Sequence, residues 1–96
     1  MVDVNAVRNR LRINHTALDS QISDDIIAAQ AELIRVGVDP AVFESNDSPL
    51  IDKAIMAYCL WIEASNDKMA DGYEQMWNQW KDELRKSSGY KVNSNV

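Results

Sequence analysis

The side chains able to do nucleophilic or metal chemistry are few and lie far apart in the sequence. There is one histidine, His15, and one cysteine, Cys59. Zinc sites need three or four ligands at short, characteristic spacings, so the sequence predicts no metal site. His15 is predicted to be a solvated or capping residue in a loop. Cys59 is predicted to be an inert thiol, because its neighbours in the sequence are bulky and apolar. A Cys59–His15 nucleophilic pair stays open as the alternative.

Adjacent acidic residues occur twice, at Asp24-Asp25 and at Asp82-Glu83. Neighbouring residues of a helix point about 100° apart, so neither pair converges on one substrate atom. The chain has no glycine-rich phosphate loop and no nucleophile-elbow motif. The tryptophans recur at helical spacing on apolar faces, which favours core packing over stacking on bases: Trp61, Trp77 and Trp80. We therefore expect no enzyme, and neither a cofactor nor a metal.

The elements that position these residues are predicted to be helices only, because the apolar residues recur at helical spacing and the chain has just three glycines and two prolines. We expect an all-α fold: a small bundle of about four helices around a central apolar helix. The predicted domain spans residues 1–86, and residues 87–96 form a flexible C-terminal tail. The expected helices cover 4–12, about 20–36, 49–64 and about 69–86, with a single turn near 40–43.

Short polar residues mark the expected helix ends. Asp3 and Ser48 are predicted N-caps of the first and central helices, and Asp19 or Ser20 is the predicted N-cap of the second. Gly37 suits the position just beyond the C-terminal end of the second helix.

The central helix is apolar on more than one side, which leaves a back stripe formed by Met56 and Cys59 beside Leu60. Ile27 and Ile34 likewise widen the apolar arc of the second helix beyond what one neighbour needs. Such spare surface is typical of a subunit interface. The arginine-rich first helix adds possible contacts to a neighbouring subunit. The candidate interface residues are Ile27, Ile34, Met56, Cys59, Leu60, Arg8 and Arg12.

The net charge of −5 is distributed unevenly along the chain. Residues 1–12 and 77–96 are each +2, and residues 13–76 are −9. An acidic protein binds nucleic acid and anionic membranes poorly, whereas basic ends suit acidic partners. With a single cysteine and no membrane-length apolar run, we expect a soluble intracellular protein that does not bind membranes.

The order of the motifs resembles the head–tail connector (adaptor, or head-completion) proteins of long-tailed bacteriophages. The first helix ends in Arg10-Leu11-Arg12-Ile13, and a second, Ile/Ala-rich helix ends in Gly37. The long apolar helix opens with Ser48-Pro49-Leu50-Ile51. A helix with a Tyr-Glu-x-x-Trp start then runs into a Ser-Ser-Gly-Tyr stretch, from Tyr73 to Tyr90. Many relatives have a His-Trp-Tyr cluster where this chain has Cys59-Leu60-Trp61.

This resemblance implies a structural virion protein that assembles into a dodecameric homo-oligomeric ring beneath the portal protein. The ring would extend the DNA channel and dock the next head-completion or tail protein, while genomic DNA passes without sequence-specific binding. The protein would be found at the head–tail interface of the virion, and in the host cytoplasm during assembly. The portal-binding role would fall on Ser88, Gly89, Tyr90, Lys91 and Val92.

Two alternatives remain. A small helical DNA-binding or regulatory protein is favoured by the arginine-rich first helix and opposed by the acidic net charge. A helical adaptor module from outside phages would share the fold without the viral role. A salt-dependent gel shift tests the first alternative, and a gene position between capsid and tail genes would separate the second from a connector.

Overall fold

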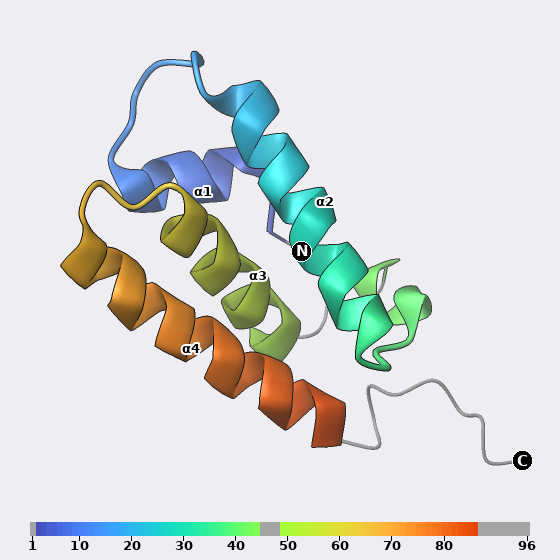
Figure 1. Cartoon of the computed structure of the whole chain (residues 1–96). Helices are drawn as coiled ribbons and strands as arrows, with labels where there is room; N and C mark the ends of the chain where they lie inside the picture. Colours follow the sequence, from blue (N-terminus) through green and yellow to red (C-terminus); the bar gives the residue numbers. More distant parts are fainter. Residues whose placement is uncertain (1, 45–48, 87–96) are drawn as a thin grey trace, which may run out of the picture.

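The computed structural model describes residues 2–44 and 49–86 and confirms the all-α fold. Its elements are α1 (Val4–Leu11), α2 (Asp19–Arg35), the 3-10 turn η1 (Pro40–Glu44), α3 (Pro49–Ile62) and α4 (Asp67–Lys86) (Figure 1). No strand occurs in these two described stretches. The predicted cap Ser48 and the predicted tail 87–96, with its portal-binding residues Ser88, Gly89, Tyr90, Lys91 and Val92, lie outside the described residues.

Helix α3 is the central element, as its apolar sequence predicts. It lies between α2 and α4, and α1 packs against both α2 and α3 (Figure 1). Three helices around one apolar helix bury most of its circumference. Its buried side chains are Ile51, Ala54, Ile55, Ala57, Cys59 and Leu60.

The N-terminal ends of α1 and α2 are capped differently. The prediction for α1 is confirmed, because Asp3 Oδ1 accepts a hydrogen bond of 2.8 Å from the Ala6 amide. The prediction that Asp19 or Ser20 caps α2 is wrong: Asp19 is the first helical residue, and Leu18 occupies the cap position without a side-chain hydrogen bond. The Asp19 carboxylate lies instead 2.8 Å from Arg8 Nε, so a tertiary ion pair replaces the local cap.

The C-terminal end of α2 has the geometry expected from Gly37. The Val38 amide donates to the Leu33 carbonyl at 2.9 Å, and the Gly37 amide donates to the Ile34 carbonyl at 3.0 Å. These two hydrogen bonds provide donors for carbonyl groups that have none within the helix. They require a left-handed backbone at Gly37, whose φ is +111°. Val38 is then fully buried, so the turn also closes one end of the core.

We expect Gly37→Ala to lower the free energy of unfolding by about 1–2 kcal/mol, because a Cβ is strained at positive φ. A Cβ added at Gly37 would meet no atom within 4 Å, so the cost is purely conformational. Gly72→Ala is the matched control. Gly72 lies inside α4 with open space around it, and alanine there should stabilise by about 0.5–1 kcal/mol. Urea unfolding measures both, and a stabilising Gly37→Ala would contradict the assigned turn.

The apolar arc of α4 is buried unevenly. Trp77 and Leu84 are buried, whereas Tyr73 and Trp80 are only half-buried. Met69 and Met76, which follow the same helical spacing, are exposed. The core contact of α4 is therefore made by Trp77 and Leu84, and the Trp77 ring meets that of Tyr58 edge-on at a centroid distance of 5.0 Å.

Candidate functional site

Large apolar side chains remain exposed on the folded chain, as the interface prediction requires. Ile27 is the most exposed of them, at 60%, and Ile34 is 42% exposed. Isolated exposed apolar residues are normal, so the arrangement matters more than the number. The other exposed large apolar side chains in the described part of the chain are Ile62, Met69 and Met76.

The expectation that Cys59 and Leu60 are spare surface is wrong. Cys59 is 0% exposed and Leu60 is 3% exposed, and Met56 is half-buried. Helical periodicity identifies α3 as apolar on several sides, but the neighbouring helices of the same chain cover the side assigned to a partner. Burial also raises the pKa of the Cys59 thiol to about 12, which makes it unreactive.

The exposed isoleucines of α2 form a ridge, which we define as Ile27, Ala31 and Ile34. These positions are spaced i, i+4 and i+7, so they align along one side of the helix over two turns. The buried apolar side chains of α2 point roughly 140° away from this ridge, into the core: Ile22, Ile26, Ala29 and Leu33. The two isoleucines of the α2 ridge are therefore largely open to solvent, and its centre is a small residue, Ala31, which also borders the cleft between α2 and α4.

A second apolar surface is a groove of about 530 Å³ between α1, α3 and α4, which we call the α3 groove. Met56 and Leu60 line it from α3, and Met76 and Trp80 line it from α4. Two predicted interface residues, Met56 and Leu60, thus belong to a concave surface rather than to an exposed stripe. The remaining lining residues are Val2, Ala6, Arg10, Asp52, Lys53 and Ala57.

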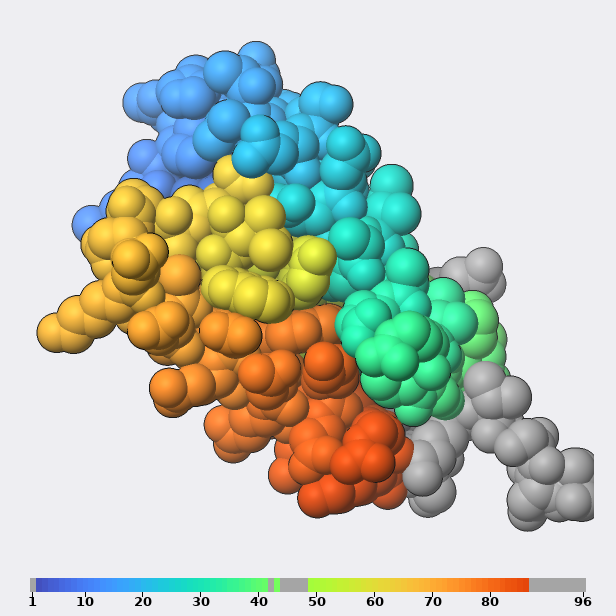
Figure 2. All heavy atoms as spheres, viewed as in Figure 1, coloured from blue at the N-terminus to red at the C-terminus, as the bar shows by residue number. Residues whose placement is uncertain are grey.

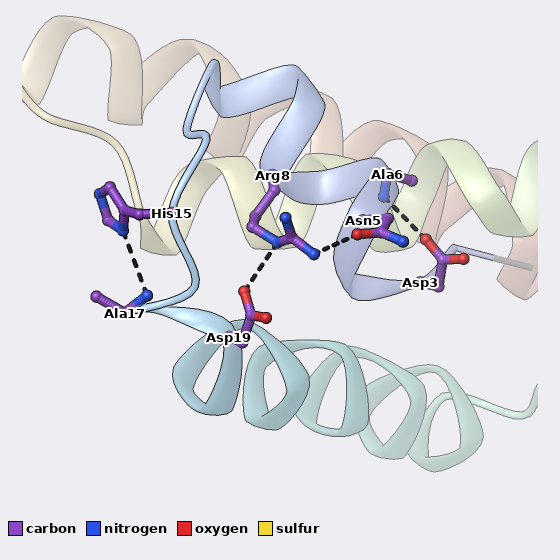
Figure 3. A network of polar contacts seen from close by, with 7 residues as sticks. All are labelled: Asp3, Asn5, Ala6, Arg8, His15, Ala17 and Asp19. Atoms are coloured by element: carbon purple, nitrogen blue, oxygen red, sulfur yellow. Dashed lines mark hydrogen bonds and ion pairs between the residues drawn. The ribbon is translucent and has the colours of Figure 1, made fainter.

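The arginines of α1 differ in their surroundings. Arg8, predicted as an interface residue, lies 2.8 Å from Asp19 at Nε and also bonds the Asn5 side chain (Figure 3). This contact fixes α1 against the start of α2, so Arg8 has a role inside the chain and is less available to DNA. Arg12 is exposed and ends α1 with a left-handed backbone, at φ 60°.

His15 is an exposed loop residue whose Nδ1 accepts a hydrogen bond of 3.3 Å from the Ala17 amide (Figure 3). The prediction of a solvated or capping histidine is confirmed. The alternative Cys59–His15 nucleophilic pair is not formed, because the thiol is fully buried and the imidazole is exposed.

A pair of carboxyl groups, the buried Asp25 and the half-buried Glu63, joins α2 to the residue that follows α3, and sequence reasoning missed it. Asp25 is 9% exposed and its side chain hydrogen-bonds Glu63. Burial, that hydrogen bond and the negative charges of Glu63 and Asp24 raise the pKa of Asp25 to about 7. Gln21 Nε2 donates to both Glu63 oxygens, at 2.9 and 2.8 Å. The Asp25 carboxyl therefore binds a proton at a pH close to neutral, and in that form it packs beside the Glu63 carboxyl.

On the side of α3 that faces away from the α3 groove, a cleft lies between α2 and α4. The C-terminal part of α3 reaches the surface at the bottom of this cleft (Figure 2). Glu32 of α2 lies 2.5 Å from Arg35 and 3.8 Å from Lys81, and these cations lower the pKa of its carboxyl. The aromatic rings in the cleft are engaged with one another, since Tyr58 contacts both Trp61 and Trp77 edge-on. The cleft thus holds internal contacts of the bundle.

The described residues contain no group of three or more His, Cys, Asp or Glu side chains placed to hold a metal ion. Within the same residues, every helix is too short or too polar to cross a bilayer. Comparison of the chain with protein-family models, curated proteins and solved structures finds no match. The α2 ridge and the α3 groove are therefore the surfaces on which a functional proposal can be built.

Proposed function

We propose that this protein is a structural subunit that assembles with copies of itself, and more specifically a head–tail connector of a long-tailed bacteriophage. In that role it forms a ring beneath the portal protein, extends the DNA channel and docks the next head-completion or tail protein. It acts through surfaces and needs neither a catalytic residue nor a cofactor. The viral assignment rests on the motif order of the sequence, and the assembly role rests on the exposed surface of the chain.

The single observation that supports self-assembly best is the α2 ridge. An isoleucine that is 60% exposed and another that is 42% exposed align two turns apart on one side of a helix. Leaving such a stripe in water is unfavourable by roughly 25 cal/mol for each Å² of apolar surface. Covering it with another subunit removes that cost, which is why contiguous apolar stripes mark assembly surfaces.

Native mass spectrometry of the chain co-expressed with the portal protein of the same genome tests the connector assignment. The expected result is a complex in which a ring of many copies, twelve by the family resemblance, is bound to the portal. The acidic net charge of −5 predicts no salt-dependent gel shift with duplex DNA, which serves as the parallel control. A chain that stays monomeric both alone and with the portal would contradict the proposal.

A further inference from the structure

The two apolar surfaces lie on different elements of the chain. The ridge belongs to α2, whereas the lining of the α3 groove comes from α1 with the preceding Val2, from α3 and from α4. A dimer that pairs ridge with ridge, or groove with groove, would cover one of these surfaces and leave the other in water. Contact between unlike surfaces covers both at once.

We infer that the α2 ridge of one copy docks into the α3 groove of the next copy. This inference deepens the proposed function and rests on it, because it assumes that the chain assembles with itself. It names the two surfaces that meet and the direction of assembly. Each copy presents its ridge to one neighbour and its groove to the other, which is a head-to-tail contact that closes into a ring when the rotation permits.

The ridge and the groove match in length and shape. Ile27 and Ile34 are seven residues apart, which is about 10 Å along a helix. The α3 side of the groove runs from Asp52 to Leu60, about 12 Å. Ala31, between the two isoleucines, is small and lets the helix backbone approach closely. A convex stripe of two large side chains thus meets a concave surface of about 530 Å³ and similar length.

The charges around the two surfaces are also complementary. Arg10 and Lys53 line the groove, together with the single carboxylate Asp52. Beside the ridge lies the exposed Asp24, one turn before Ile27, whereas near its other end Glu32 forms ion pairs with both Arg35 and Lys81. The cationic rim of the groove can therefore meet the Asp24 carboxylate, which favours this docking over contact between two α2 helices that each present Asp24.

Disulfide trapping between separately purified full-length variants tests this pairing. One variant has a ridge cysteine, Ile27→Cys or Ile34→Cys, and the other has a groove-wall cysteine, Met76→Cys. The native Cys59 does not compete, because it is fully buried. After mild oxidation of the mixture we expect a covalent heterodimer of ridge and groove variants. It should form at least tenfold faster than the ridge–ridge dimer.

Met69→Cys is the matched control for the groove. Met69 lies on the same helix two turns earlier and is 45% exposed, against 41% for Met76, but it does not line the α3 groove. It should cross-link to neither ridge variant above the background rate. Ridge–ridge dimers as the main product, or equal cross-linking of Met69→Cys and Met76→Cys, would overturn the inference.

The same samples separate failure of this inference from failure of the proposed function. Before oxidation, light scattering reports whether the variants and the wild type associate. Association without ridge–groove cross-links refutes the docking while leaving the connector proposal intact. Absence of any association, alone or with the portal, refutes both.

Discussion

Replacing Trp77 with alanine is expected to lower the free energy of unfolding by about 3–5 kcal/mol, the usual cost of removing a buried tryptophan. Trp77 is 2% exposed and packs edge-on against Tyr58, and Lys81 lies 5.4 Å from the centre of its ring. It is one of the two buried side chains of α4, with Leu84, and its ring contact with Tyr58 joins α4 to α3. Urea unfolding at one fixed protein concentration measures the loss, since self-association would otherwise change the apparent stability.

Met69→Ala is the control on the same helix. Met69 is 45% exposed, so its truncation should change the free energy of unfolding by less than about 0.5 kcal/mol. If Trp77→Ala cost as little as Met69→Ala, α4 would not be packed on α3 as described.

The stability of the protein is expected to fall as the pH rises from about 4 to 7, because of Asp25. Its pKa is raised from 3.8 to about 7, so the folded chain holds a proton that the unfolded chain releases. The stabilising contribution is complete below pH 4 and lost above pH 7. At 1.36 kcal/mol per pKa unit, the loss is on the order of 3–4 kcal/mol. Glu32 and Asp82 act oppositely: hydrogen bonds and nearby cations lower the pKa of each carboxyl, so their contribution to stability is lost only in more acid solution.

Thermal and urea unfolding between pH 4 and 8 measure this effect. Asp25→Asn keeps the shape of the side chain but cannot titrate. The variant should therefore lose little stability between pH 4 and 8, and at pH 8 its free energy of unfolding should exceed that of the wild type. Asp24→Asn, at the exposed neighbouring position, should keep the decline. A wild-type stability that rises steadily across this range would show that Asp25 titrates normally.

The fold could be predicted from the sequence because its signals are local. Helical spacing of apolar residues, Asp3 as a cap and Gly37 as a helix end each act within a few residues, and the structure confirms all three. The apolar length of α3 also identified it as the central helix. These features depend on chain geometry rather than on which helices meet.

What the sequence could not predict depends on distant contacts. Cys59 and Leu60 were assigned to a partner, but the other helices of the same chain cover them, and nothing local to α3 indicates this. The sequence identified Asp25 only as one of two adjacent acidic residues, yet its side chain meets Glu63, far along the chain. Periodicity also placed Trp77 and Trp80 on the same arc, and only the packing of α3 decides that Trp77 is the buried one.

The central claim is that copies of this chain cover the apolar surface that one copy leaves exposed. Light scattering over a range of concentrations, on the wild type and on a variant with both Ile27→Lys and Ile34→Lys, tests it most directly. The account predicts a wild-type mass that is a multiple of 10.9 kDa, and a variant that stays at 10.9 kDa with unchanged helix content. A wild type that remains at 10.9 kDa at every concentration, with or without the portal, would contradict it.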